Sequence, residues 1–352
     1  MQREYGIDLL KIVAMLFIVV DHILLWGGWG FCAGQSGVKG HVLELLDAIC
    51  LCHVNCFVLA SGWIMSRLEF KFKRIVKLWL EVWGYSLVFL LIWLCFPNSR
   101  FSMKAVMTNL LPIIRDRYWF FTQYTILFFA MPLLNAAIKN LDLKILSKVL
   151  ITGFFCFSLH PFAFKTDIFN LNRGYSALWF MYLYLFAGTM SVKGFFQNVK
   201  RSILIGLIVF AVIGGVAMLH IRGALLSGIE LSFDPNVFRA YNCPFILLYS
   251  VALLLLFSNV NVSSNRARTL IAMVAPSVFA VYVIHSNPLF RGMTNWNVFW
   301  GRFLDGHSTL VCAVGTISSA MLIFVTCILI DCMRKRIWAR VLPKLTSCIG
   351  GR

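Results

Sequence analysis

The sequence predicts an all-α protein, a polytopic bundle of transmembrane helices with about ten spans. Two observations lead to this prediction. Of the 352 residues, 60% are hydrophobic and only 13% are charged, against roughly 25% charged residues in an average soluble domain. In addition, apolar segments of about 20 residues, the length that crosses a bilayer, recur along the chain. We therefore expect one integral-membrane domain over residues 1–352.

The predicted spans follow one another with short loops between them, and no polar linker divides the chain. Each is apolar over most of its length, so each is expected to be a membrane helix. In chain order they are Leu9–Trp29, Val42–Met65, Ile75–Pro97, Trp119–Ile138, Ile145–Phe164, Ala177–Ser191, Ile203–Ile221, Pro244–Ser258, Leu270–Leu289 and Leu310–Ile330.

The distribution of basic residues predicts that both termini are cytosolic. With ten spans and a cytosolic N-terminus, the cytosolic segments carry 21 of the 32 Lys and Arg residues and the outer loops carry 11, as the positive-inside rule requires. The loop with Arg100, Lys104, Arg115 and Arg117 runs against this bias. We expect a multi-pass protein of the cytoplasmic (inner) membrane. The net charge of +18 is explained by these loops and by anionic lipid, so no nucleic-acid partner is expected.

The first span carries ionisable residues at regular spacing. A charge at the bilayer centre costs about 2.5–3.5 kcal/mol, so such residues need a reason to be there. Lys11 and His22 are eleven residues apart, which at about 100° per residue brings them to one helix face, and Asp8 joins the same stripe. His22 lies about 22 Å of helix rise beyond Ile7, in the outer half of the bilayer. It can relay a proton there, or simply bond a backbone carbonyl at the interface.

The second span is also too polar for a helix that faces lipid. Asp47, His53 and Asn55 lie within it, and such groups must face the bundle interior or a water-filled cavity. Glu44 and Asp47 can alternatively lie near the outer interface. Cys50 and Cys52 point about 200° apart on a helix, so we do not expect a metal site there. The span ends in the small residues of Ala60-Ser61-Gly62, which permit close helix packing.

A basic cluster follows the second span, and a second histidine lies late in the chain. Lys71, Lys73, Arg74 and Lys77 form either an ordinary positive-inside cluster or a binding site for a phosphate-rich cytosolic ligand. His285 lies fifteen residues into the ninth predicted span, at about the depth of His22. The two histidines are therefore expected to share a polar cavity, unless their matched depth is coincidental.

Five segments in chain order resemble motifs of the acyltransferase-3 family of membrane-bound acyltransferases, over nearly the whole chain. Each motif is weak alone, but their order and their places in the predicted topology agree. They are Tyr5-Gly6-Ile7-Asp8-Leu9-Leu10-Lys11 through His22, Cys56-Phe57-Val58-Leu59-Ala60-Ser61-Gly62-Trp63, Arg74-Ile75-Val76-Lys77, Trp119-Phe120-Phe121 with Tyr124 and Pro132, and Ala275-Pro276-Ser277 through Tyr282-Val283-Ile284-His285.

The chain departs from the family pattern at several positions. Lys11 and Lys77 stand where the family has arginine, which keeps the charge and loses bidentate donation. Trp63 replaces the usual phenylalanine, and Tyr124 stands where one large branch of the family has an acid. The chain therefore resembles the branch whose fourth span begins Trp-Phe.

The resemblance implies an O-acetyltransferase that moves an acetyl group from cytosolic acetyl-CoA to a hydroxyl of a cell-surface or exported glycan, or of its lipid-linked precursor. Acetyl-CoA is then a co-substrate, no cofactor stays bound, and the partners are the glycan acceptor and membrane lipids. The implied catalytic residues are His22, Lys11, Asp8 and His285; the donor-binding residues are Lys71, Lys73, Arg74, Lys77 and Ser61; the acceptor-binding residues are Trp119, Tyr124 and Trp179. No metal is implied.

Two questions stay open at the level of sequence. His22 can act as a general base towards a sugar hydroxyl or carry the acyl group covalently, and the aromatic residues can belong to the interfacial belt instead of lining an acceptor mouth. The alternative function is a transporter or flippase of a glycan lipid, whose intramembrane charges would line a substrate path. Transporters often have inverted repeats and broken helices, and neither is evident in the sequence.

Overall fold

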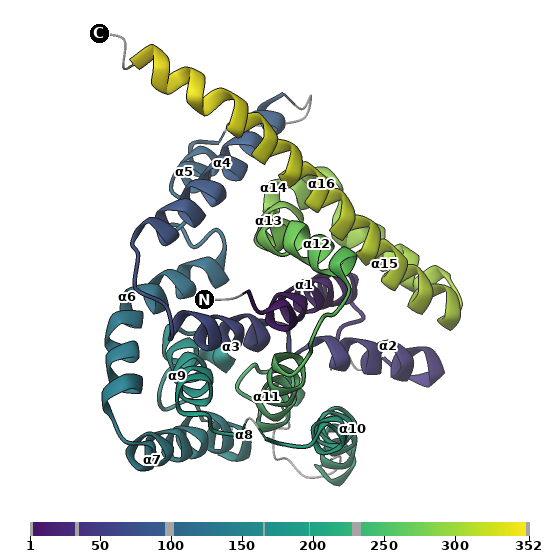
Figure 1. The fold of residues 1–352 in the computed structure, drawn as a ribbon. Coiled ribbons are helices and arrows are strands. Elements are labelled where there is room, and N and C mark those ends of the chain that lie inside the picture. The colour runs from purple at the N-terminus through teal and green to yellow at the C-terminus, as the bar shows by residue number, and fades with distance from the viewer. Residues whose placement is uncertain are drawn as a thin grey trace.

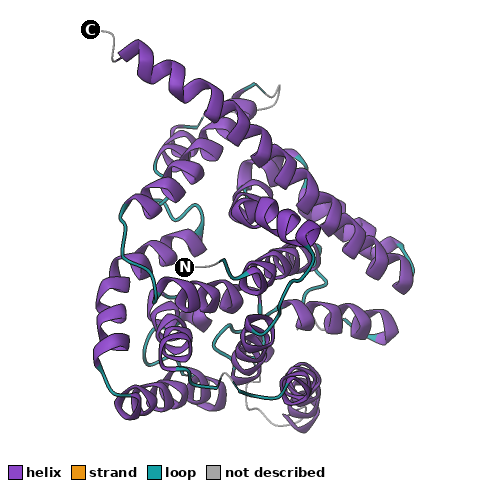
Figure 2. Ribbon diagram, in the orientation of Figure 1, coloured by secondary structure: helices purple, strands orange, loops and turns teal. Residues whose placement is uncertain are grey.

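The computed structural model describes residues 3–31, 35–95, 102–164, 166–196, 198–226 and 234–349. Within these ranges the chain forms helices and connecting loops, and no strand occurs (Figure 2). The all-α prediction is confirmed. The α-helices are α1 (Tyr5–Trp26), α2 (Gly37–Cys50), α3 (His53–Met65), α4 (Lys73–Leu94), α5 (Met103–Leu110), α6 (Trp119–Asn140), α7 (Leu143–Gly153), α8 (His160–Phe164), α9 (Ala177–Lys193), α10 (Arg201–Leu226), α11 (Pro244–Ser258), α12 (Asn265–Val274), α13 (Val278–His285), α14 (Pro288–Met293), α15 (Trp296–Gly306) and α16 (Thr309–Ile349).

Short helical turns of other types join some of these helices. A π-helical segment, η1 (Phe154–Leu159), connects α7 to α8, and 3₁₀ turns occur at η2 (Asn172–Gly174), η3 (Pro235–Val237) and η4 (Ala275–Ser277).

Helix length and composition agree with a multi-pass membrane protein. Within the described ranges, eight helical segments are long and apolar enough to cross a membrane. They are Tyr5–Trp26, Gly37–Met65, Lys73–Leu94, Trp119–Asn140, Leu143–Phe164, Arg201–Ile221, Asn265–His285 and Thr309–Ala339. Each overlaps a span predicted from the sequence, with boundaries that differ by up to about nine residues. Pro97, the predicted end of the third span, lies outside the described residues.

The other two predicted spans form shorter helices. Helix α9 has 17 residues and α11 has 15. At 1.5 Å of rise per residue, α11 is about 22 Å long, less than the roughly 30 Å of a bilayer's hydrocarbon core. The count of ten spans and the cytosolic position of both termini therefore stay predictions.

Two of the predicted spans, each expected to be one continuous helix, are interrupted. The ninth predicted span runs as α12, the 3₁₀ turn η4 and α13. Pro276 lies in that turn and accounts for it, because proline has no N–H to donate and its ring clashes with the carbonyl four residues earlier in a helix. The second predicted span divides into α2 and α3 around Leu51 and Cys52.

Helix α1 lies in the middle of the bundle (Figure 1). It contacts helices from both halves of the chain, including α2, α3, α11, α13 and α16. Close packing also joins α3 to α9, where a Cβ atom added to Gly62 would lie 2.6 Å from the carbonyl oxygen of Tyr184. The prediction that small residues at the end of the second span allow close approach is thus confirmed. This arrangement surrounds the polar residues of α1 with protein.

Candidate active site

His22 on α1 and His285 at the end of α13 are in direct contact. The Nδ1 atom of His22 lies 2.8 Å from the Nε2 atom of His285. The side chain of His285 is fully buried, whereas His22 is only half-buried. The two histidines that the sequence places at one depth therefore form a pair, and His22 is the member that solvent or a substrate can reach.

A third contact determines where each imidazole of this pair holds its proton. The Nδ1 atom of His285 lies 2.6 Å from the carbonyl oxygen of Val281. A carbonyl can only accept, so Nδ1 of His285 carries hydrogen and Nε2 of the neutral ring is an acceptor. That acceptor requires a hydrogen on Nδ1 of His22. Neutral His22 therefore has its lone pair on Nε2, for which the described residues provide no hydrogen-bond partner.

The surroundings of the pair hold both rings in place. Trp26 stacks on His22 with ring centroids 4.1 Å apart and planes 22° apart. The hydroxyl of Ser286 lies 3.5 Å from His22 Nδ1 and 3.4 Å from His285 Nε2. Asn287, the next residue, is the N-cap of α14. Its side-chain oxygen accepts from the backbone N–H of Leu289 (2.9 Å), which separates α14 from α13.

A buried cluster of charges lies beside His22. The guanidinium of Arg239 pairs with the carboxylates of both Asp21 and Asp47, and His53 lies 3.5 Å from Asp21. Asp47 is fully buried and its carboxylate also accepts from the backbone N–H of Phe31. Asp47 therefore faces the protein interior rather than lipid, as expected for a charged group in this span, and its depth relative to the interface stays open.

Arg239 itself lies outside the membrane-spanning helices. Burial would lower the pKa of Arg239, but its two carboxylate neighbours raise that pKa above the ordinary value. The cluster thereby holds the loop that precedes α11 against α1 at Asp21, the residue next to His22. Sequence reasoning missed Arg239, since a single arginine in a loop gives no sign of which carboxylates it will meet.

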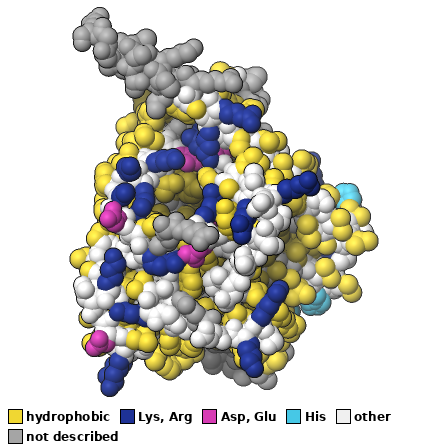
Figure 3. Space-filling view, viewed as in Figure 1, with side chains coloured by type: hydrophobic (Ala, Val, Ile, Leu, Met, Phe, Trp, Pro, Cys, Tyr) yellow, Lys and Arg dark blue, Asp and Glu magenta, His cyan; other side chains and the backbone are white. Residues whose placement is uncertain are grey.

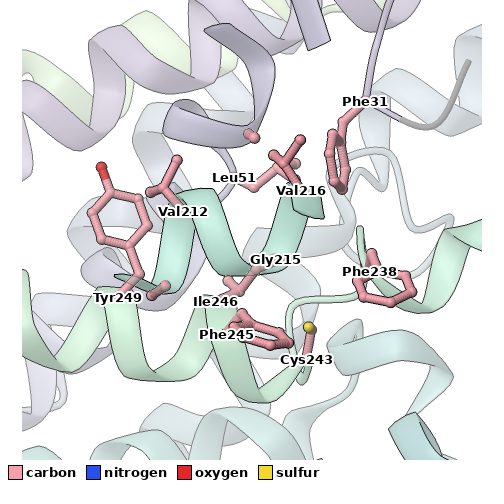
Figure 4. Close-up of a pocket in the computed structure, with 12 residues that line it drawn as sticks. Phe31, Leu51, Val212, Gly215, Val216, Phe238, Cys243, Phe245, Ile246 and Tyr249 are labelled. Carbon is pink, nitrogen blue, oxygen red and sulfur yellow. The ribbon is translucent and has the colours of Figure 1, made fainter. Parts of the chain in front are cut away.

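A small apolar cavity adjoins this cluster. Its volume is about 20 Å³, and it lies between α10, α11 and the residues that precede α2 and α11 (Figure 4). Phe31 and Phe238, from the two loops that reach the Arg239 cluster, form part of its wall. The lining is almost wholly apolar, so the cavity gives a water molecule few polar partners. We interpret it as a packing space behind the charged cluster.

Lys11 and Asp8 share α1 with His22 but lie near its other end. The Nζ atom of Lys11 is 3.5 Å from Asp8, and Arg3 also pairs with Asp8 at 2.7 Å. Eleven residues of helix separate Lys11 from His22, about 16 Å of rise. The structure therefore does not bring Lys11 and Asp8 to the histidine pair.

The predicted donor-binding residues gather near the start of α1. Glu4 pairs with Arg67 (2.5 Å) and accepts from the indole of Trp63 (2.8 Å), so the end of α3 lies beside the start of α1. We call this side of the bundle the N-terminal face. Lys71, Lys73 and Lys77, which follow α3, are exposed. Figure 3 shows many Lys and Arg side chains on one face of the molecule, around a central hollow.

Arg74 and Ser61 lie deeper than the three lysines. The guanidinium of Arg74 donates to the backbone oxygen of Glu69 (2.6 Å), and it is close enough to Tyr124 to interact electrostatically. Tyr124 in turn donates to the hydroxyl of Ser61 (3.3 Å). Tyr124, predicted at the acceptor side, is thus grouped with two predicted donor-side residues.

The remaining predicted acceptor residues differ in accessibility. Trp119 is half-buried and packs against Tyr175 (4.4 Å between centroids) and Tyr241 (5.9 Å, planes 16° apart). Trp179 is fully buried, and its indole N–H donates to Asn55 (3.1 Å). Trp119 can therefore present part of its ring to a sugar, whereas Trp179 supports the helix packing behind it.

The other cavities and clusters lie away from the histidine pair. An apolar cavity of about 820 Å³ is lined by residues of α7, α9, α10 and α11, and none of the predicted site residues borders it. On α2 and α10, the ligand atoms of His41, Glu44 and His220 lie within 4.8 Å of one another, the one such group among the described residues. His41 and His220 are exposed.

The comparisons with known proteins agree with the family that the motifs indicate. The family model described as "Acyltransferase domain" (Acyl_transf_3) matches residues 4–331. No curated protein matches the chain. No solved structure matches it either. Because the family model covers nearly the whole chain, this membrane protein belongs to the acyltransferase-3 family.

Proposed function

We propose that this acyltransferase moves an acetyl group from acetyl-CoA to a hydroxyl of a cell-surface or exported glycan, or of its lipid-linked precursor, in the cytoplasmic membrane. The observation that supports the proposal best is the half-buried His22, whose Nε2 lone pair is available while its Nδ1 is held by His285 (2.8 Å). A sugar hydroxyl is a poor nucleophile, and a positioned imidazole is the usual base that activates it.

The proposed reaction is a direct transfer of the acetyl group from CoA to the sugar. The Nε2 atom of His22 takes the proton of the sugar hydroxyl as the oxygen attacks the thioester carbonyl. The carbon–sulfur bond then breaks, and the CoA thiolate leaves with the proton that His22 received. The products are an O-acetyl ester and free CoA, and the enzyme returns to its starting state.

Donor and acceptor would approach from different sides. The exposed lysines at the N-terminal face suit the phosphates of CoA, and His22 lies about 22 Å of helix rise above Ile7. A thin, mostly uncharged pantetheine arm can enter the bundle interior, whereas its phosphates would stay at the surface. The aromatic cluster around Trp119 suits a sugar ring on the acceptor side.

The proposal is tested by replacing His22 in purified protein reconstituted into liposomes. We expect His22→Ala to lower acetyl transfer from labelled acetyl-CoA by roughly 10²–10⁴-fold, the usual contribution of a general base. The matched control is His307→Ala, since His307 is exposed and its Nδ1 only contacts the backbone oxygen of Phe303 in the preceding helix (2.9 Å). Wild-type turnover by His22→Ala, at equal abundance and fold, would reject the assignment.

The covalent route is separated from the general-base route in the same preparation. Labelled acetyl-CoA is supplied without any acceptor, and the peptide that contains His22 is examined by mass spectrometry. A general base leaves that peptide unlabelled, whereas a covalent carrier accumulates an acetyl-imidazole.

A further inference from the structure

Two arginines near the histidine pair take no part in the reaction described above. Arg291 on α14 has its guanidinium 3.9 Å from the ring centroid of Trp26, the residue that stacks on His22. It is close enough to His22 and to His285 to interact with both electrostatically. Arg117, in the loop before α6, interacts electrostatically with Arg291. Two guanidinium groups thus lie at the end of the bundle where His22 is.

One buried residue connects both arginines to the segment that carries His285. The side-chain oxygen of Asn287, which caps α14, accepts from Arg117 (3.2 Å), and its amide donates to Tyr118 (2.8 Å). The backbone N–H of Arg291 donates to the backbone oxygen of the same asparagine (3.0 Å). Asn287 is fully buried, so this framework is rigid relative to the histidine pair.

Neither arginine has a carboxylate partner among the residues that the structure describes. Other arginines of the chain do: Arg3 pairs with Asp8, Arg67 with Glu4, and Arg239 with Asp21 and Asp47. The Nε atoms of Arg117 and Arg291 are both buried without a hydrogen-bond partner. Burial lowers the pKa of each arginine from its ordinary value. Two like charges held close together in a partly dry site are costly unless an anion joins them.

The sequence contains an independent sign of the same site. In the predicted topology, the loop that contains Arg117 lies outside the cell membrane and carries four basic residues, where the positive-inside rule expects few. Lys104 and Arg115 in this loop are exposed, whereas Arg117 points inward to Asn287. The predicted membrane orientation therefore does not explain the charge of Arg117.

We propose that Arg117 and Arg291 bind an anionic group, a carboxylate or a phosphate, on the acceptor glycan, and so place a neighbouring hydroxyl at His22. Guanidinium forks bind both kinds of oxyanion through paired, charge-assisted hydrogen bonds. This inference rests on the proposed function for the identity of the hydroxyl that reacts, and it specifies that the acceptor is an acidic glycan or a sugar phosphate.

Anion binding can be measured without turnover, by chemical protection of His22. Diethyl pyrocarbonate modifies the unprotonated nitrogen of a histidine, and mass spectrometry reports the rate for the peptide that contains His22. The protein is used at full length in lipid-free detergent, with glucuronate, glucose 1-phosphate or glucose added as the probe. We expect the two anions to slow modification of His22 and glucose to have no effect at equal concentration.

Variants then assign the protection to the two arginines. Arg291→Gln and Arg117→Gln should each raise the anion concentration needed for half-maximal protection by roughly tenfold, as expected for the loss of a charge-assisted hydrogen bond. Arg291→Lys should retain part of it. The matched control is Arg173→Gln, because Arg173 is exposed and pairs with Asp234 at 3.0 Å. If Arg117→Gln does not fold, Arg291→Gln decides alone.

Several results would overturn the proposal. These are equal protection by glucose and the anions, no protection by any probe, or protection that survives Arg291→Gln. Protection by short-chain phosphatidylglycerol alone would assign the arginines to a lipid headgroup and also reject it. The proposed function fails separately, if His22→Ala keeps wild-type acetyl transfer while the anions still protect His22 in the wild-type protein.

Discussion

The hydrogen bond between His22 and His285 determines which nitrogen of His22 can act as a base. His285 is fully buried and bonded to the backbone of its own helix through Nδ1, so its Nε2 can only accept while the ring is neutral. The second histidine is therefore a positioning residue for the first. It also stabilises the extra proton that His22 holds during the reaction, as an acceptor on the far nitrogen does in other imidazole bases.

Replacing His285 should lower the chemical rate and leave donor binding intact. We expect His285→Ala to reduce kcat by up to about 10⁴-fold, the loss found when the residue that fixes the tautomer of a catalytic histidine is changed in serine proteases. His285→Gln should keep more activity, since its side-chain oxygen can accept from Nδ1 of His22. Steady-state kinetics with acetyl-CoA measure both variants. A His285→Ala protein with wild-type kcat would show that the pair has no role in the reaction.

At the scale of elements, the site depends on a break that the sequence signals and on a loop that it does not. Pro276 marks the interruption between α12 and α13, and the Asn287-Pro288 pair is a recognisable helix start. The pairing of Arg239 with Asp21 and Asp47 joins residues about 190 and 220 positions apart, and no local pattern specifies such a pairing. Local rules therefore account for these helix boundaries, although the predicted span Leu270–Leu289 runs through both of them, whereas this charge cluster requires the tertiary fold.

The Arg239 cluster should contribute strongly to stability. Arg239→Ala would leave two buried carboxylates without a counter-charge, and breaking a buried ion pair in this way costs about 3–5 kcal/mol. We expect a lower midpoint of thermal unfolding in detergent, with a smaller loss for Asp47→Asn, which leaves the pair with Asp21. Arg173→Ala is the control, since its exposed pair with Asp234 should contribute about 0–1 kcal/mol. Equal losses for Arg239→Ala and Arg173→Ala would contradict this interpretation.

At the scale of the whole molecule, the sequence predicts the helices and the depth of the histidines, but not which side chains surround them. Hydropathy finds the membrane segments because apolar length is a property of each segment alone. Depth along a helix likewise follows from residue number, and it correctly suggested that His22 and His285 could meet. The contact of Tyr124 with Ser61 does not follow from either segment alone, because helix rotation is set by packing among α3, α6 and α9.

Donor binding and chemistry should take place at different ends of the bundle. The exposed Lys77 and the half-buried Arg74 lie beyond the end of α3, which meets the start of α1 at Glu4, whereas His22 lies about 26 Å of helix rise beyond Tyr5. Phosphates of CoA bound at this face would not contact the reacting atoms. Arg74→Ala and Lys77→Ala should therefore each raise the KM for acetyl-CoA by roughly tenfold, because each removes a charge-assisted hydrogen bond to the donor, with little change in kcat.

Lys144→Ala is the matched control for this prediction, because Lys144 is an exposed lysine at the start of α7 outside the cluster after α3. Its KM for acetyl-CoA should equal that of the wild type. Direct titration of acetyl-CoA onto the purified variants measures binding apart from turnover, and the His22→Ala protein should bind the donor nearly as well as the wild type does. An Arg74→Ala, Lys77→Ala double variant with unchanged affinity would place the CoA phosphates elsewhere. If only His22→Ala weakened acetyl-CoA binding, donor binding and chemistry would share one location near the histidine pair.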